Sequence, residues 1–252
     1  MGRCLRSLRD QTSHCDVIVV DRFSNDGTAE LAKDFGVELI RSGARRSEAR
    51  NIGLKHARSD GVLFLDSDMI APPSLIQECE NGLVKHEALF IPEESIGTGF
   101  WAKCKAVERR LYVGDAIMEA ARCFRRNTLV GLGGYNPELE AGEDWDLQNR
   151  VEVHHLNLGR VSPTILHDEG QLSLSSITRK KYSYGKSFAK YVHDNMTVSI
   201  GQINPLRRII VPGLRILPYS PKLAAGFTIM KSIELTSAGL GHLIGNSKQE
   251  FS

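Results

Sequence analysis

The sequence predicts an α/β fold in which a mostly parallel sheet is flanked by helices. Short apolar runs alternate with amphipathic segments over the first two-thirds of the chain, a rhythm typical of a parallel sheet with helices on both faces. The content of 41% hydrophobic and 25% charged residues is ordinary for a soluble globular protein with a sizeable core. A chain of 252 residues is long enough for one large domain, or for one domain with an appendage.

Each expected element has its own local signal. Residues 16–21 read as a buried strand because their β-branched core is continuous rather than alternating. Thr28 can cap a helix that Gly36 ends, and Ser74 with Gln77 forms a capping box that opens another helix. In chain order, we expect helices over 3–11, 28–35, 47–57 and 75–85, and strands over 16–21, 37–40, 62–65 and 88–91.

Carboxylates follow two of these strands directly. Asp21 ends the strand at 16–21, and Asp66 and Asp68 come just after the strand at 62–65. Ligands of parallel α/β sheets bind outside the carboxyl ends of the strands, where these side chains would form an acidic rim suited to a hard divalent cation. The D-x-D spacing alone is weak evidence, since chance gives roughly two-thirds of one such match in this composition. The alternative is a loop that solvates two carboxylates and caps the next helix.

An acidic pair and a histidine in the second half of the chain also have two interpretations each. Glu143 and Asp144 suit a helix N-terminus, where they complement the helix dipole, and equally a general base held near a reacting hydroxyl. His167 follows an apolar run. A lone histidine is more often structural than a ligand, but one at a strand end could complete an Asp-Asp-His metal shell.

The basic residues and cysteines narrow the class of protein. Arg45, Arg46 and Arg50 open a helix, either as a solvated basic face or as a site for a diphosphate. The net charge of +2 does not argue for nucleic acid. The five cysteines are scattered and form no C-x-x-C pair, which indicates reduced thiols rather than disulfides or a zinc site. Because the first residues also lack the apolar run of a signal peptide, we expect a cytoplasmic protein with no nucleic-acid partner.

The composition changes at about Ile200. Residues 207–219 mix basic and apolar residues between prolines, and residues 223–244 are apolar but broken by Lys231, Glu234 and His242. That interruption makes a poor transmembrane span, so an amphipathic element lying on protein or on a membrane surface is favoured. We therefore expect a main domain over residues 1–199 and a helical, membrane-proximal extension over residues 200–252, with peripheral contact to the cytoplasmic face of a membrane.

Three motifs in order resemble the family 2 glycosyltransferases of the GT-A fold, which have a mostly parallel, Rossmann-like sheet. VIVVDRFSNDGT (17–28) resembles their V-D-D-G-S-x-D-G-T nucleotide-binding segment. SEARNIGLKHARSDGVLFLDSDM (47–69) resembles their A-R-N-x-G helix followed by the L-D-x-D metal motif. LVGLGGYNPELEAGEDWDLQNRV (129–151) resembles their G-G-F-D-E segment and E-D-W/Y-D-L acceptor motif. The resemblance covers roughly residues 3 to 190.

The resemblance implies a role for each matching residue. Asp144 would be the general base, with Glu143 helping to hold the acceptor. Asp21 would contact the base of the nucleotide, and Asp66 would lie near its ribose. The nucleotide sugar would also contact Arg45 and Arg50. Asp68, with Asp66 and His167, would hold Mn²⁺ or Mg²⁺ at the diphosphate.

The implied function is transfer of a sugar from a UDP- or GDP-sugar to a hydroxyl of a glycan or lipid-linked acceptor, with inversion at the anomeric carbon. Three alternatives stay open: a retaining transferase of the same fold, a nucleotidyltransferase, and a non-catalytic sugar-nucleotide binder or truncated inactive transferase. The sequence departs from the family pattern at Arg22-Phe23, where Asp-Gly is usual. It also lacks the family's first strand, so the domain reads as N-terminally truncated and we expect a further strand before Met1.

Overall fold

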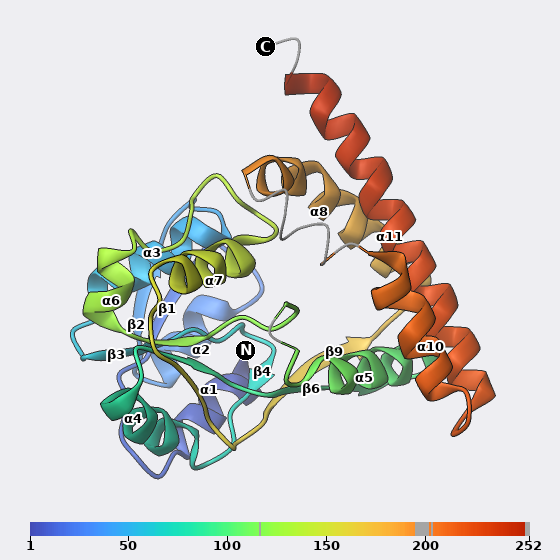
Figure 1. Ribbon diagram of the computed structural model, residues 1–252. Coiled ribbons are helices and arrows are strands. Elements are labelled where there is room, and N and C mark those ends of the chain that lie inside the picture. Colours follow the sequence, from blue (N-terminus) through green and yellow to red (C-terminus); the bar gives the residue numbers. More distant parts are fainter. Residues whose placement is uncertain (116, 195–201, 203, 250–252) are drawn as a thin grey trace. The chain divides into compact units, whose positions relative to one another are not determined.

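The structure, a computed structural model, describes residues 1–115, 117–194, 202 and 204–249 (Figure 1). The chain divides into two compact units, each built from several segments. Unit 1 comprises Met1–Glu93, Ala120–Glu138 and Glu143–His167, and unit 2 comprises Glu94–Glu119, Leu139–Gly142 and Asp168–Ser252. The expected domain boundary at 199/200 lies outside the described residues, and that division stays a prediction.

Unit 1 contains every element expected in the first ninety residues, each within three residues of its predicted ends. Its helices are α1 (Gly2–Arg9), α2 (Thr28–Asp34), α3 (Arg46–His56), α4 (Leu75–Lys85), α6 (Arg126–Gly131) and α7 (Glu143–Val153). Its strands are β1 (Ile18–Asp21), β2 (Glu38–Arg41), β3 (Gly61–Leu63), β4 (Met69–Ile70), β5 (Ala88–Phe90), β7 (Cys123–Arg125) and β8 (Leu158–Arg160), together with the first part of β9 (Ile165–Gln171).

The α/β fold class is confirmed, with one correction: the sheets are mixed rather than mostly parallel. β1 pairs with β2, and β5 pairs with β8, in parallel. β7, however, lies antiparallel between β3 and β5. A three-residue strand such as Cys123–Arg125 is too short for hydrophobic periodicity to reveal, which is why the sequence did not predict it. β1 and β3 belong to separate sheets within the described part of the chain.

Both capping predictions were wrong in detail. The N-cap of α2 is Gly27, whose φ of 84° lies in the left-handed region that glycine tolerates, rather than Thr28. Ser74 is the N-cap of α4 but makes no side-chain cap hydrogen bond. The backbone N–H of Ile76 is instead capped by Oε1 of Gln11, at 3.0 Å, from a segment more than sixty residues away. A distant side chain has replaced the local cap.

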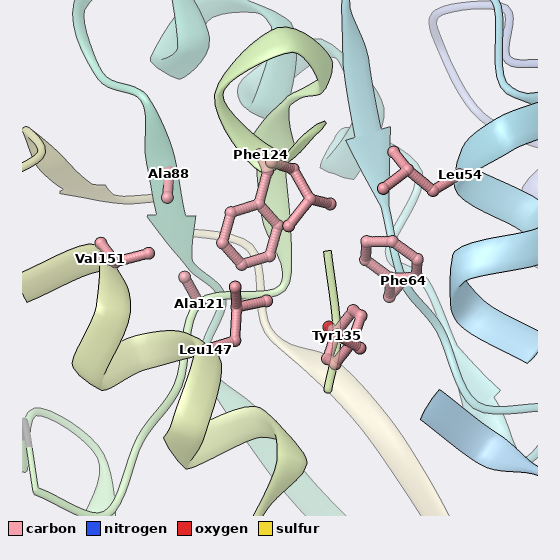
Figure 2. Packing of buried hydrophobic residues seen from close by; sticks show 9 residues of the cluster. Leu54, Phe64, Ala88, Ala121, Phe124, Tyr135, Leu147 and Val151 are labelled. Carbon is pink, nitrogen blue, oxygen red and sulfur yellow. The ribbon is translucent and has the colours of Figure 1, made fainter. Parts of the chain in front are cut away.

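The core of unit 1 joins the strands to the helices that carry the motifs (Figure 2). Phe64, just after β3, packs edge-on against Phe124 and Tyr135, with ring centroids 6.4 and 5.1 Å apart. Leu147 and Val151, one turn apart on α7, close this cluster from the helix side. Burial of these side chains, at about 25 cal/mol per Å² of apolar surface, fixes the first turn of α7 against the sheet.

Unit 2 is mostly helical. It contains β6 (Glu93–Thr98) after its first residue, the last part of β9, α5 (Phe100–Tyr112), α8 (Leu174–Asp194), the π-helical turn η1 (Leu206–Ile210), α10 (Val211–Ile216) and α11 (Pro221–Gln249). The backbones of α8 and α11 approach closely, because a Cβ placed on Gly185 would lie 2.0 Å from the carbonyl oxygen of Ala238. The expected helical C-terminal segment is present, and α11 is its long helix (Figure 1). Among the described residues, no helix combines the length and hydropathy needed to cross a bilayer.

Candidate active site

The site is organised around the guanidinium of Arg50 on α3, in unit 1. Its Nη1 donates to Oδ1 of Asp144 at 2.6 Å, and its Nη2 donates to Oδ1 of Asp66 at 3.2 Å. Oε1 of Glu143 lies 3.5 Å from the same Nη1. The guanidinium stacks over the ring of Tyr135, 4.8 Å from its centroid. One buried fork therefore joins the carboxylate after β3 to the two carboxylates that begin α7.

Asp66 lies between two arginines. Cys123 of β7 pairs with Leu63 of β3, and the N–H of Phe64 donates to the carbonyl of Arg122, so Arg122 enters the site beside the residues that follow β3. Its Nη2 lies 3.9 Å from Oδ2 of Asp66. Burial by itself raises the pKa of Asp66, but Arg122 and Arg50 together hold that pKa below its ordinary value. Asp66 is thereby kept ionised, although about two-thirds of its side chain is covered by protein.

Asp68 and His167 meet because of a strand register. Met69 of β4 pairs antiparallel with His167 of β9, which places the preceding Asp68 beside the imidazole. Nε2 of His167 is 3.4 Å from Oδ2 of Asp68, and its Nδ1 is 3.6 Å from Oε2 of Glu93. The hydrogen bond from His167 lowers the pKa of Asp68.

This pair fits a divalent cation. The Asp68 side chain is about half exposed (52%), and an imidazole backed by a second carboxylate is the arrangement that orients a metal-binding histidine. The structure brings together two of the three expected metal ligands and turns Asp66 toward the arginines instead. Within the residues that the structure describes, no group of three or more His, Cys, Asp or Glu side chains is close enough to hold an ion by itself. The remaining ligands would therefore have to come from substrate or water.

Glu143 and Asp144 occupy the first turn of α7 in different environments. Glu143 is buried, with Oε1 also 3.3 Å from Nη1 of Arg46. Burial, and next the charge of Asp144, raise the pKa of Glu143, while Arg50 and Arg46 oppose the shift. Asp144 keeps a third of its side chain exposed (33%). Of the two carboxylates, Asp144 is the one that a second substrate can reach.

Asn51 and Gly134 hold the ring on which Arg50 stacks. The Asn51 side chain donates to the carbonyl of Tyr135 at 2.7 Å and accepts from its N–H at 2.8 Å. Gly134 has a φ of 70°, and a Cβ there would lie 2.5 Å from Oδ1 of Asn51. The Arg50-Asn51 pair of one motif thus requires the glycine of the Gly133-Gly134 pair in another, because a side chain at Gly134 would displace Asn51.

The two other predicted nucleotide-binding residues are placed as follows. Asp21 ends β1 and is buried; both its oxygens lie 3.2 Å from the N–H of Ser24, and Oδ2 is 3.4 Å from Nε of Arg41. Phe23, which lies between Asp21 and Ser24 in the chain, adopts a positive φ of 53°. Asp21 thus shapes the turn after β1. Arg45 is the extended residue immediately before α3.

The structure unites Asp66, Arg50, Glu143 and Asp144 in one cluster, and Asp68 with His167 in a second. Sequence reasoning missed Arg122, which contacts Asp66 of the first cluster, and Glu93, which contacts His167 of the second. Nε of Arg122 donates to Oε1 of Glu93, so the two residues link the clusters. Glu93 could have been found, because it follows the predicted strand at 88–91 and such strand ends bind ligands. Arg122 could not, because it precedes the unpredicted β7. The roles of Asp21, Arg45 and Arg50 toward a nucleotide stay predictions.

Comparison with known structures identifies the class. The fold resembles a mannosyltransferase from Pyrobaculum calidifontis, solved with GDP-Man and Mn²⁺, with a TM-score of 0.59 at 17% identity over 95% of this chain and 81% of that one. It also resembles S. aureus TarS 1–349, solved with UDP-GlcNAc, with a TM-score of 0.55 at 12% identity over 99% and 87% of the two chains. The fold is therefore that of the GT-A glycosyltransferases.

The family follows from the sequence comparison. A model described as glycosyl transferase family 2 matches residues 1–127, and the chain belongs to that family. An uncharacterized glycosyltransferase from Haemophilus influenzae is 27% identical over 161 residues, which is 56% of this chain and 54% of that protein. The match thus spans about half the length of this curated relative.

Proposed function

We propose that this chain is a divalent-metal-dependent, inverting glycosyltransferase that moves a sugar from a nucleoside diphosphate sugar to an acceptor hydroxyl. One observation carries the proposal: the fork of Arg50 fixes Asp144, a partly exposed carboxylate at a helix N-terminus, against Asp66, the carboxylate that follows a strand end. This arrangement sets a base at a fixed distance from the side of the site where family members bind the nucleotide.

Asp144 takes the proton from the acceptor hydroxyl as its oxygen attacks the anomeric carbon and the bond to the diphosphate breaks. A general base of this kind typically contributes about 10²- to 10⁴-fold to the rate. Arg50 orients Asp144 through a hydrogen bond, and Glu143 behind it supports the position of the arginine. A single displacement from the face opposite the diphosphate inverts the anomeric configuration, which NMR of the product would report.

Asp68 and His167 are the residues that would hold the cation, with Glu93 orienting the imidazole. When bound, Mn²⁺ or Mg²⁺ neutralises negative charge on the leaving diphosphate. The solved relatives that bind GDP-Man with Mn²⁺ and UDP-GlcNAc support a purine or pyrimidine nucleotide sugar as donor. We propose a glycan or lipid-linked hydroxyl as acceptor.

The test is Asp144→Asn, which keeps the shape of the side chain and removes the base. Transfer should fall by about 10²- to 10⁴-fold, while binding of a nucleotide sugar, measured by calorimetry, stays near the wild-type affinity. Asp146→Asn is the matched control on the same helix, since Asp146 pairs with Arg150 on α7 rather than with Arg50. Transfer by Asp144→Asn at the wild-type rate would show that Asp144 is not the base.

A further inference from the structure

Between Leu223 and Ile244, helix α11 carries its charges on the inside. Between Leu223 and Ile244 its only Lys, Arg, Asp or Glu residues are Lys231 and Glu234, and both are buried. Nζ of Lys231 donates to Oε1 of Glu108 on α5 at 2.6 Å and also contacts Glu234. Lys105 donates to the same two glutamates, at 2.8 and 3.2 Å. A surface helix in water normally shows the reverse pattern, with its charges outward.

Between Leu223 and Ile244, the outer face of α11 carries no Lys, Arg, Asp or Glu, and its one titratable side chain is the half-buried His242. Its exposed large side chains are Ile229, Leu240, Leu243 and Ile244. These positions are 11, 3 and 1 residues apart, a spacing that places them on one side of a helix. The exposed positions between Ile229 and Leu240, which are Ser232, Thr236 and Gly239, are small and neutral.

The segment before α11 repeats this character. Leu206, Ile210, Leu214 and Leu217 recur every three or four residues through η1 and α10, and each is at least 47% exposed. Tyr219, at 90%, follows them. We call these five side chains, with the four exposed on α11, the apolar face. Nine large apolar side chains exposed on two consecutive helical segments of unit 2 indicate an interaction surface.

The surrounding charge selects the partner. Residues 172–249 contain eleven lysines and arginines but only two acidic residues, and one residue of each kind, Lys231 and Glu234, is buried. Two exposed basic residues lie close to these apolar side chains in the sequence: Arg215 on α10 and Lys222 in the first turn of α11. A second copy of the chain would bring the same positive charge and be repelled. An anionic lipid surface is complementary to both the apolar side chains and the cations.

We propose that the apolar face docks unit 2 on an anionic bilayer, with α10 and α11 lying in the interface rather than spanning it. The leucines and isoleucines enter the acyl boundary while Arg215 and Lys222 contact lipid headgroups. The inward placement of Lys231 and Glu234 follows, because those charges would otherwise meet hydrocarbon. This inference is independent of the proposed transfer reaction.

The experiment is co-sedimentation of the full chain with phosphatidylcholine vesicles that contain or lack phosphatidylglycerol. The wild type should bind the anionic vesicles and lose affinity as salt is raised. Leu240→Gln with Leu243→Gln should weaken partitioning by roughly tenfold or more, since each leucine removed from lipid is worth up to about that factor. Arg215→Glu should weaken binding only to the anionic vesicles.

The matched control is Val84→Gln with Val153→Gln, two valines of unit 1 that are each 73% exposed and outside the apolar face. This variant should bind vesicles like the wild type, and equal loss in both double variants would overturn the proposal. So would wild-type protein that stays in the supernatant at low salt. Light scattering without lipid measures the oligomeric state. If the wild type is a dimer and the variant with both Leu240→Gln and Leu243→Gln is a monomer, the apolar face is an interface between copies, and the lipid proposal is wrong. Unchanged thermal melting of each variant confirms that it is folded.

Discussion

At the scale of single residues, Arg50 illustrates why guanidinium and ammonium groups are not interchangeable. Its two terminal nitrogens reach different carboxylates, while its planar face stacks on Tyr135. Burial lowers the pKa of Arg50, but Asp144, Asp66 and the other neighbouring groups raise it well beyond its usual range, so the charge is permanent. A lysine would carry the charge without the fork.

We therefore expect Arg50→Lys to fold, yet to lower kcat by about tenfold to a hundredfold, because one charge-assisted hydrogen bond is lost from the pair that positions Asp144. Steady-state kinetics with a nucleotide sugar would measure this. Arg58→Lys, at an exposed position just after α3, is the control and should leave kcat unchanged. A wild-type kcat for Arg50→Lys would mean that the fork does not position the base.

At the scale of elements, the join between α3 and the loop before α7 depends on one glycine. We expect Gly134→Ala to lower the free energy of unfolding by about 2–4 kcal/mol, since alanine at positive φ costs about 1–2 kcal/mol and its Cβ would displace Asn51. Denaturant unfolding measures this. Gly131→Ala, at a helical position with open space around it, should be neutral or slightly stabilising. Equal effects at both positions would rule out the clamp.

The second element-scale prediction concerns the buried charges that join α5 to α11. Lys231→Met should lower the free energy of unfolding by about 3–5 kcal/mol, because Glu108 and Glu234 lose a buried counter-charge. The exposed Lys103→Met on α5 should change it little. Restoring the charge balance with Glu108→Gln in the Lys231→Met background should recover part of the loss. If Lys231→Met is as stable as Lys103→Met, the network is not stabilising.

The contribution of this network to the free energy of unfolding also depends on pH. Burial and Glu234 raise the pKa of Glu108, but Lys105 and Lys231 outweigh them and lower it from 4.5 to about 2. A carboxylate with a lowered folded-state pKa stabilises the protein above its unfolded value, so this contribution is complete above about pH 4.5 and is lost as the pH falls toward 2.

At the scale of the whole molecule, the donor and the cation should stabilise the folded protein together. We expect Mn²⁺ with a UDP- or GDP-sugar at about a hundred times its Kd to add about 2.7 kcal/mol, which raises Tm by several degrees. Differential scanning fluorimetry measures the shift, and chelation by EDTA should remove the metal-dependent part. Asp68→Asn should also remove the metal-dependent part of the Tm shift, whereas Asp34→Asn, at an exposed position, should leave that part unchanged. A shift in Asp68→Asn that still depends on Mn²⁺ would place the cation elsewhere.

The positive charge is distributed unevenly along the chain. The net charge is +2, yet residues 172–249 alone hold eleven basic and two acidic residues. All five cysteines lie among the described residues and are free thiols, as predicted. The cytoplasmic localisation stays a prediction.

The sequence by itself determined the elements of the first ninety residues except the two-residue β4, together with the family motifs and the carboxylates at the strand ends, because strand and helix periodicity and turn chemistry are local. Only the tertiary structure decided which charges meet. Arg122 joins Asp66 through the register of β3 with β7, and His167 joins Asp68 through the register of β4 with β9. Lys231 is buried on a helix that leaves Ile229, Leu240 and Leu243 exposed. Each depends on pairing between segments far apart in the chain, which no local pattern records.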